Sequence, residues 1–367
     1  MKELQSIVHA ILAPETSGAV LATLVSLAGS SYRRPGARLL VTADGRRLGS
    51  ISGGCLEEDV MARAVRVAET GVPDVVVYDT RSENNLVWGV GLGCHGVVRV
   101  LLEKLPTRPE WADRLARNAA GRRPTRLLVR HGGADRTLWG TRLAAESEKE
   151  SDDDVFLQII APPPALAIFG AGDDAMPLVR FANDLGWHVT VADPRASMAT
   201  ATRFPQADAR TVGPAEQLVA RVYGPGPAPA PPVHRSLGEG GGGVEGLAVV
   251  MTHHYVHDVP LLRDLLPRPL AYLGLLGPKT RTEKILADLA AGGFAITPEM
   301  RERLHAPVGL DLGADTPEQV ALAIVAEMLA VLAHREARPL RERTQPIHEV
   351  FAPQKPLLRT THDVENP

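Results

Sequence analysis

The spacing of apolar side chains in the first part of the chain alternates between helical and strand-like. Helical spacing runs through residues 4–12 and again through residues 56–68, directly before a glycine. The continuous apolar runs that predict strands are residues 19–27, 74–79 and 97–102. Asp44-Gly45 predicts a hairpin turn between two further strands. Together these patterns predict an N-terminal mixed α/β domain over residues 1–105.

The pattern weakens after residue 105. Residues 106–160 predict a variable connector with one hairpin, in the stretch TRLLVRHGGADRTLWGTRL. Residues 224–246 are rich in glycine and proline and lack the apolar surface needed to order themselves, so we expect a flexible insertion there. The polar, proline-bearing end of the chain predicts a loose tail over residues 339–367.

Strands and helices alternate over residues 161–338. The strand ALAIF precedes a glycine turn and a helix, and the strands HVTVAD, GLAVVMT and LAYLGLLG follow. Thr316, followed by proline and then by Gln319, predicts a capping box at the start of a long apolar helix. Such alternation predicts a parallel sheet with helices on both faces. The expected fold class is therefore α/β, with a mixed domain followed by a Rossmann-like parallel-sheet domain.

Composition and charge exclude several classes of function, and they say less about the fold. The 367 residues carry a formal net charge of −3 with a pI near 6.5, so there is no basic field of the kind that binds nucleic acid. We find no apolar run of about 18 residues and no charged-then-apolar leader, and therefore expect neither a membrane span nor a secretory signal. The only two cysteines lie outside any CxxC pair, which favours a reducing cytoplasm.

The stretch FGAGDDA carries the first candidate chemistry. It follows a predicted strand and opens a helix, and Asp193 ends the next strand, as in dinucleotide-binding folds. Gly170 would allow the tight turn, Gly172 would let backbone N–H groups approach a pyrophosphate, and Ala175 is the permitted third small residue. Asp193 would then bind ribose hydroxyls, so NAD(P) or another nucleotide is a candidate ligand. Glycines are also needed for any tight turn of this kind, bound nucleotide or not.

Two acidic residues in the same turn oppose a pyrophosphate. Asp173 and Asp174 suit a helix N-terminus, but they would repel an anionic ligand that arrives at that end.

A histidine-rich stretch, MTHHYVHD, follows the strand GLAVV, at the sheet edge where open α/β folds carry their sites. His253, His254 and His257 are possible zinc ligands, although no cysteine or carboxylate stands at a defined spacing from them. The alternative is that Asp258, before Val-Pro, caps a helix.

The two cysteines both lie in glycine-rich turns. Cys55 follows Gly53-Gly54 and precedes a predicted helix start, where the helix dipole favours a thiolate and free N–H groups can bind an anion. Cys94 lies in GVGLGCHGVV beside His95. Free cysteines are commonly small buried core residues, and that alternative stays open for each cysteine alone. Because neither lies in an apolar run, the pair favours thiols presented for chemistry.

The turn GSSYRRPG offers groups that bind anions. Ser31 and the guanidinium groups of Arg33 and Arg34 are potential clamps for a phosphate.

Taken together, these stretches resemble the xanthine dehydrogenase accessory protein family, the XdhC/CoxI-type molybdenum cofactor maturation factors. GSSYRRPGARLLV, GSISGGCLEEDV and GLGCHG are similar to the amino-terminal domain of that family. AIFGAGDDA, VTVADPR, MTHHYVHD, YLGLLGPKTRT and VGLDLGADTPEQVALAIVAEML are similar to its Rossmann-like domain, in the same order. The likeness does not extend to residues 106–160, the insertion or the tail. His95 stands where the family more often has glycine, and Asp173 stands where it often has histidine.

The resemblance implies a protein that binds the molybdenum cofactor (molybdopterin), supports its sulfuration and inserts it into a xanthine dehydrogenase/CO dehydrogenase-type molybdenum hydroxylase. It implies a carrier rather than an enzyme, a homodimer, and two partners, the client hydroxylase and a cysteine desulfurase. Its cofactor-associated cysteine region matches this chain at Cys55 and Cys94. The predicted cofactor-binding residues are these two cysteines with Gly53, Gly54, Ser31, Arg33 and His95.

The chemistry of those residues agrees with this implied cargo. A thiolate suits a soft, thiophilic metal, so Cys55 and Cys94 are candidate molybdenum ligands. Arg33, Ser31 and the amides of Gly53-Gly54 suit the phosphate of the cofactor. The sequence leaves open which cysteine binds the metal.

Two alternative functions remain. One is an NAD(P)-dependent oxidoreductase that uses the Rossmann-like domain, but no general acid or hydride-transfer geometry can be assembled from the sequence. The other is a structural or regulatory partner of a molybdenum enzyme with a vestigial ligand site.

Overall fold

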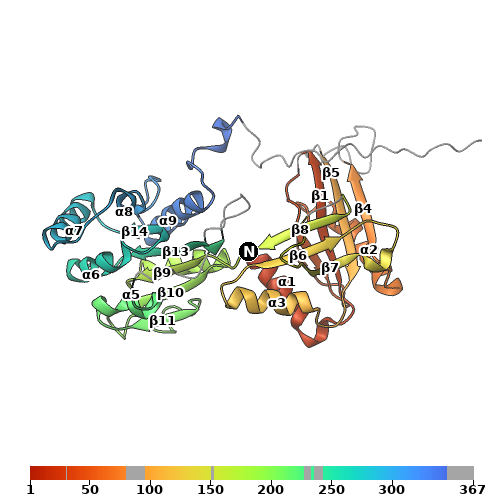
Figure 1. The fold of residues 1–367 in the computed structure, drawn as a ribbon, viewed down its shortest axis with the longest axis horizontal. Coiled ribbons are helices and arrows are strands. Elements are labelled where there is room, and N and C mark those ends of the chain that lie inside the picture. The colour runs from red at the N-terminus through yellow and green to blue at the C-terminus, as the bar shows by residue number, and fades with distance from the viewer. Residues whose placement is uncertain (30, 80–95, 150–152, 227–232, 235–242, 345–367) are drawn as a thin grey trace, which may run out of the picture. The chain divides into compact units, whose positions relative to one another are not determined.

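A computed structural model describes residues 1–29, 31–79, 96–149, 153–226, 233–234 and 243–344 (Figure 1). Contacts between residues divide the chain into two units, which are described separately. The first consists mainly of residues 6–113 and 126–158, and the second mainly of residues 159–339. The helices α1 (Lys2–Leu12) and α3 (Glu110–Ala120) have residues in both.

The described part of the first unit contains two β-sheets and the helix α2 (Glu57–Thr70), together with most of α1. The larger sheet is antiparallel, with the strand order β3-β2-β1-β5-β4. Its strands are β1 (Val20–Gly29), β2 (Arg38–Val41), β3 (Arg47–Gly49), β4 (Asp74–Asp79) and β5 (Gly96–Lys104). The smaller sheet has the order β7-β6-β8, with β6 (Thr125–Arg130), β7 (Gly140–Leu143) and β8 (Val155–Ile160). β2 and β3 pair across the predicted Asp44-Gly45 turn, which confirms that hairpin.

Both faces of the larger sheet are covered. On one face, Val60, Ala64 and Val67 of α2 pack against β1, β2, β4 and β5. On the other face, the smaller sheet contributes Val129, which packs against Val25 and Leu101 of the larger sheet. Figure 1 shows β6, β7 and β8 lying across β1 and β5. Because β1 is buried on both sides, its sequence VLATLV is a nearly continuous apolar run rather than an alternating one.

The topology brings several candidate segments to one end of this sheet. β1 ends at Gly29, and Gly96, the first residue of β5, pairs with it. β3 is antiparallel to β2, which is antiparallel to β1, so Gly49 at the end of β3 lies toward the same end. The segments that contain Ser31 and Cys55 both leave from this end of the sheet.

The second unit contains a mostly parallel sheet with the strand order β11-β10-β9-β13-β14-β15. Its strands are β9 (Ala165–Phe169), β10 (His188–Asp193), β11 (Ala209–Val212), β13 (Gly243–Val250), β14 (Leu270–Leu275) and β15 (Leu304–His305), and β12 (Val233–His234) pairs antiparallel with β13. Its helices are α4 (Ala175–Asp184), α5 (Ala215–Tyr223), α6 (Tyr255–Leu265), α7 (Lys279–Ala291), α8 (Pro298–Glu302) and α9 (Pro317–Leu332).

Helices cover both faces of this sheet, which confirms the Rossmann-like prediction. α4 and α9 pack on one face, and α5, α6 and α7 pack on the other. The central strand β9 has β10 on one side and β13 on the other, so the strand order reverses at β9. Open α/β sheets carry their ligand sites at such a reversal, beyond the carboxyl ends of the strands.

The predicted capping box of α9 is also present. The Thr316 hydroxyl accepts the Gln319 N–H at 3.4 Å, and the Gln319 side chain accepts the Thr316 N–H at 3.1 Å. A helix N-terminus can be predicted this well because its partners are only three residues apart in the sequence.

Three predicted regions lie partly outside the described residues. Most of the predicted insertion, and all of the tail beyond residue 344, lie outside the residues that the structure describes. Residues 106–160 contain α3, β8 and the antiparallel pair β6–β7, which spans the stretch predicted to form a hairpin. Among the helices that the structure describes, none is long and apolar enough to cross a membrane.

Candidate functional site

Cys55 lies in a short loop between β3 and α2, residues 50–56, here called the cysteine loop. The Cys55 side chain is exposed, and the residue lies two positions before the first residue of α2. Gly54 has a φ of +112°, in the region that favours glycine, and a Cβ added there would meet nothing within 4 Å. The loop therefore presents its cysteine outward, as expected for a thiol that takes part in chemistry.

A buried carboxylate holds this loop from the inside. Glu57, the first residue of α2, is only 2% exposed. Its Oε1 accepts the Ser50 hydroxyl at 2.7 Å, the Ser52 N–H at 2.9 Å and the Ile51 N–H at 3.2 Å. Its Oε2 accepts the Leu56 N–H at 3.2 Å and the Ser52 hydroxyl. Burial alone would favour the neutral acid, but the hydrogen bonds from Ser52 and Ser50 outweigh it and lower the Glu57 pKa from 4.5 to about 2.

The amides of the cysteine loop divide into two groups. The Ser52 hydroxyl oxygen accepts the N–H of Leu56 at 3.1 Å and that of Gly54 at 3.2 Å. Within the part of the chain that the structure describes, the N–H groups of Gly53 and Cys55 have no hydrogen-bond partner. Two amides on either side of Gly54 are thus available to an anion.

The turn that contains Ser31 and Arg33 lies beside this loop. A Cβ on Gly53 would stand 3.8 Å from Cδ1 of Tyr32, so the tyrosine ring lies against the glycine. Ser31 and Arg33 are half-buried, whereas Tyr32 is 70% exposed. The structure therefore places the turn with Ser31 and Arg33 beside the cysteine loop, two segments that the sequence predicts to bind the cofactor. Tyr32 was missed, although it is a single aromatic residue in a polar turn of a chain with only 4% aromatics.

Cys94 and His95 lie outside the described residues. The described residue next to them is Gly96, which pairs with Gly29, two positions before Ser31. The chain therefore enters β5 at the end of the sheet from which the Ser31 turn leaves.

The Rossmann-like turn has the glycine geometry that its sequence predicts. Gly170 has a φ of +120°, and a Cβ there would collide with the backbone of Met251. A Cβ on Gly172 would stand 2.7 Å from an Asp174 carboxylate oxygen. Ala175 is the first residue of α4 and is fully buried in the core.

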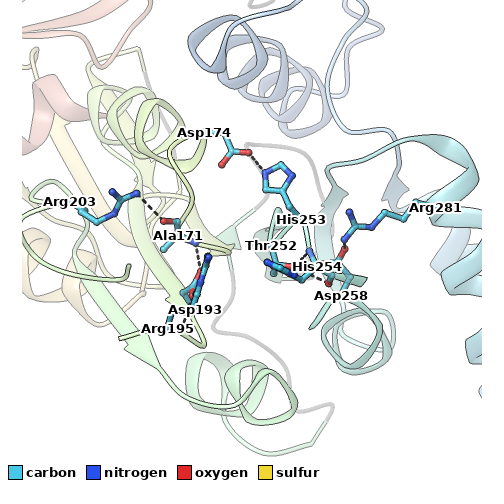
Figure 2. A network of polar contacts seen from close by, with 10 residues as sticks. All are labelled: Ala171, Asp174, Asp193, Arg195, Arg203, Thr252, His253, His254, Asp258 and Arg281. Atoms are coloured by element: carbon cyan, nitrogen blue, oxygen red, sulfur yellow. Dashed lines mark hydrogen bonds and ion pairs between the residues drawn. The ribbon is translucent and has the colours of Figure 1, made fainter. Parts of the chain in front are cut away.

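Asp193 ends β10 and is fully buried, and protein donors use both of its carboxylate oxygens (Figure 2). Oδ2 accepts the Ala171 N–H at 2.7 Å and Nη2 of Arg195 at 2.9 Å. Oδ1 accepts the N–H of Arg195 at 2.8 Å and its Nε at 2.9 Å. Burial favours the neutral acid, but the bonds from Arg195 and Ala171 lower the Asp193 pKa. A ribose would have to compete with these donors for the same oxygens.

The two acids of the turn are paired across it. Asp173 accepts Nη2 of Arg203 at 2.7 Å, and an Asp174 oxygen lies 2.5 Å from Nε2 of His253. Figure 2 shows Asp174, at the start of α4, and His253, in the segment after β13, pointing toward one another. The carboxylates predicted to repel a pyrophosphate are thus matched by cationic or titratable groups of the same unit.

The histidine-rich stretch forms a separate polar cluster. The Thr252 hydroxyl donates to Asp258 at 2.5 Å and accepts the His254 N–H at 3.0 Å, and Asp258 also accepts Nη2 of Arg281. Burial is the main effect on the Asp258 pKa, which it raises. Among the described residues, no group of three histidine, cysteine or acidic side chains could hold a metal ion.

The prediction that Asp258 caps a helix is wrong. α6 starts at Tyr255, with His254 as its N-cap, and it continues through Pro260. Asp258 therefore lies inside the first turns of the helix, where its carboxylate bonds to side chains of neighbouring segments instead of to helix amides.

Comparison with known proteins finds relatives of both units. Residues 13–79 match the model of the XdhC and CoxI family, and residues 166–328 match that of the XdhC Rossmann domain. A probable xanthine dehydrogenase subunit of Bacillus subtilis is 32% identical over 332 residues, which cover 85% of this chain and 92% of that protein. The molybdenum cofactor insertion chaperone PaoD of Escherichia coli is 24% identical over 319 residues, which cover 87% of this chain and 85% of that protein.

A solved structure has the same fold over most of the chain. The crystal structure of a xanthine dehydrogenase from Bacillus halodurans superposes with a TM-score of 0.73 and 29% sequence identity, covering 93% of this chain and 99% of that one.

Proposed function

The chain belongs to the XdhC and CoxI family, and on this premise we propose that it binds the molybdenum cofactor and takes part in the maturation of a molybdenum enzyme. The observation that carries the proposal is the cysteine loop, which combines an exposed thiol with two unpartnered amides among the described residues. The cofactor combines a soft metal with a phosphate, and the loop offers a donor for each.

Each part of the cofactor has a matching group in this region. The Cys55 thiolate would bind the molybdenum, and the N–H groups of Gly53 and Cys55 would bind the phosphate, supported by Ser31 and Arg33. The exposed Tyr32 ring beside Gly53 offers a flat apolar face against which the pterin can stack. Gly54, between these two residues, supplies the positive φ that this loop conformation requires.

The glycine-rich stretch that contains Cys94 belongs to the same proposal. Cys94 and His95 precede Gly96, which pairs with Gly29 at the end of the sheet that also carries the Ser31 turn. We assign Cys94 as a second candidate ligand of the metal, and His95 as a further contact to the cofactor. Either cysteine alone, or both together, would suit a soft metal.

We propose a carrier rather than an enzyme. The protein would hold the cofactor while a cysteine desulfurase supplies sulfur, and would then insert it into a xanthine dehydrogenase/CO dehydrogenase-type molybdenum hydroxylase. A cytoplasmic homodimer fits this role. The name of the Escherichia coli relative, a molybdenum cofactor insertion chaperone, supports insertion as the step in which this chain acts.

The oxidoreductase alternative has less support. The Rossmann-like turn has the required glycines, but Arg195 and the Ala171 amide use the Asp193 oxygens that would hold a ribose. Asp173 and Asp174 stand at the end of α4 where a pyrophosphate would bind.

Cofactor retention tests the proposal. Purified protein is mixed with molybdenum cofactor released from a molybdenum enzyme, passed over gel filtration, and assayed for molybdenum and for pterin fluorescence. We expect the wild type to retain both, and Cys55→Ala to retain about tenfold less, equivalent to about 1.4 kcal/mol of binding free energy. Val65→Ala, on the exposed face of α2, is the matched control and should retain as much as the wild type.

The outcomes separate the parts of the proposal. A wild-type protein that retains neither molybdenum nor pterin would overturn cofactor binding. Full retention by the double variant Cys55→Ala, Cys94→Ala would overturn only the thiol assignment. The two single variants then show which cysteine carries the metal contact.

A further inference from the structure

We infer that Glu57 is the positioning residue of the cofactor site: its buried carboxylate selects which amides of the cysteine loop remain available to the ligand. The inference rests on the proposed function, because it assigns a role to a residue behind the proposed site. Glu57 itself does not touch the ligand, since its side chain is only 2% exposed and faces the inner side of the loop.

Most of the hydrogen-bond donors to Glu57 belong to the cysteine loop and not to its own helix. An acidic residue in the first turn of a helix usually stays at the surface and interacts with the helix dipole, as the exposed Glu58 beside it does. Glu57 instead accepts hydrogen bonds from Ser50, Ile51 and Ser52, which precede the glycines. The bond from the Leu56 N–H comes from the start of the helix.

The arrangement sorts the amides of the loop into inner and outer ones. Glu57 uses the N–H groups of Ile51, Ser52 and Leu56, and the Ser52 hydroxyl, itself bonded to Glu57, uses that of Gly54. The N–H groups of Gly53 and Cys55, which lie closest in the chain to the exposed thiol, have no partner among the described residues. A buried anion thus satisfies the amides that the ligand cannot reach and leaves the outer ones unpaired.

The chemistry of the carboxylate suits this role. Hydrogen bonds to a charged acceptor are stronger than those between neutral groups, so an ionised Glu57 holds the loop more rigidly than an amide of the same shape would. A loop held in its binding conformation loses less conformational entropy when the ligand arrives. Replacing the charge should therefore weaken cofactor binding even where the fold survives.

The test compares Glu57→Gln and Ser52→Ala with Glu58→Gln. The control removes the same charge from the next position of the same helix, where the side chain is exposed. Ser52→Ala keeps the carboxylate but removes the hydroxyl that links it to Gly54 and Leu56, and so serves where Glu57→Gln fails to fold. For the thiol measurement all variants carry Cys94→Ala, so that Cys55 is the only thiol, whereas cofactor retention is measured with Cys94 present and the wild type as the parent.

Four quantities are measured. Circular dichroism checks folding, and hydrogen exchange is followed in the peptide that covers residues 50–56. The other two are the retention of molybdenum cofactor and the rate at which Cys55 reacts with 5,5′-dithiobis(2-nitrobenzoate). For Glu57→Gln and Ser52→Ala we expect a native spectrum, exchange roughly tenfold faster in this peptide, and cofactor retention roughly tenfold lower. Thiol reactivity should change beyond the range of the Glu58→Gln control.

The results distinguish failure of this inference from failure of the proposed function. If the parent protein retains no cofactor, the proposed function fails, and the exchange and thiol rates alone decide whether Glu57 positions the loop. If the parent retains cofactor while both folded variants match Glu58→Gln in exchange, thiol rate and retention, the positioning role is overturned. Faster exchange with unchanged retention and thiol rate would reduce Glu57 to a structural residue, which also contradicts the inference.

Discussion

Two glycine turns of this protein lead into helices, and their acidic side chains act in different ways. In the cysteine loop, Glu57 turns inward and accepts loop amides, so that outer amides and a thiol are left for a ligand. In the Rossmann-like turn, Asp193 also accepts an amide, that of Ala171, but the acids of the turn itself pair with side chains from other segments. The first turn keeps its carboxylate behind its unpaired amides. The second also has unpaired amides among the described residues, those of Gly172, Asp173 and Asp174, but carries two carboxylates beside them.

The difference shows that a glycine-rich turn before a helix is not sufficient evidence for a ligand site. In both turns, backbone amides gather at the positive end of a helix. The two turns differ in whether the nearest carboxylate is buried on the inner side of the turn or exposed on its outer side. Glu57 is buried behind its loop, whereas the Asp173 side chain is 85% exposed at the end of α4.

The largest expected effect is the difference in stability lost when one glycine of each turn is replaced by alanine. Gly170→Ala should destabilise the second unit by roughly 2–5 kcal/mol, because its Cβ combines a strained φ with a collision against the Met251 backbone. Gly54→Ala meets no atom within 4 Å and carries only the cost of the left-handed conformation, roughly 1–2 kcal/mol. Urea unfolding, with hydrogen exchange followed in each unit, measures both. Equal losses would show that the two turns are under similar steric constraint.

A smaller effect concerns the two buried acids at low pH. Both have a pKa lowered by folding, so the stability they contribute is present at neutral pH and is lost as the pH falls. For Glu57 the loss should begin below about 4.5 and extend toward 2. The difference in melting temperature between wild type and Glu57→Gln should therefore shrink as the pH falls from about 4.5 toward 2, and that between wild type and Asp193→Asn should shrink as the pH falls below about 3.8. A gap that stays constant over this range would contradict the assigned direction.

The smallest expected effect is that of a dinucleotide on the second turn. Asp173 and Asp174 place two carboxylates where a pyrophosphate would bind, and Arg195 and the Ala171 amide use the Asp193 oxygens. NAD(H) or NADP(H) at about 1 mM should therefore leave the melting temperature unchanged, whereas a ligand at a hundred times its Kd would stabilise by about 2.7 kcal/mol. Differential scanning fluorimetry is the measurement, and Arg195→Ala, which releases the Asp193 oxygens, is the companion variant. A saturable shift in the wild type would restore the oxidoreductase alternative.

Local sequence was sufficient for many elements. The parallel sheet with helices on both faces, the hairpin at Asp44-Gly45 and the capping box at Thr316 all depend on residues a few positions apart or on apolar periodicity. The glycines of both turns were also identifiable, since a tight turn into a helix needs them. The same local reasoning failed for Asp258, because the start of α6 depends on how its apolar face packs and not on the position of Pro260.

Partners that are distant in the sequence could not be found in this way. Asp193 and Ala171 are 22 positions apart, Asp174 and His253 are 79 apart, and Tyr32 lies against Gly53 across the fold. Glu57 is only a few residues from its partners, but whether an acid at a helix start turns inward or outward depends on whether the surrounding core buries it.

Periodicity, turn chemistry and ordered motifs are properties of the chain, and they were enough to predict the two kinds of architecture, the glycine turns, the exposed-thiol hypothesis for Cys55 and the family. Which acids neutralise which donors became visible only once the chain was folded. That result separates a loop whose carboxylate is buried behind its free amides from a turn whose carboxylates stand at the start of its helix. Burial and hydrogen-bond partners depend on neighbours in space, and those neighbours follow from the packing of the whole unit.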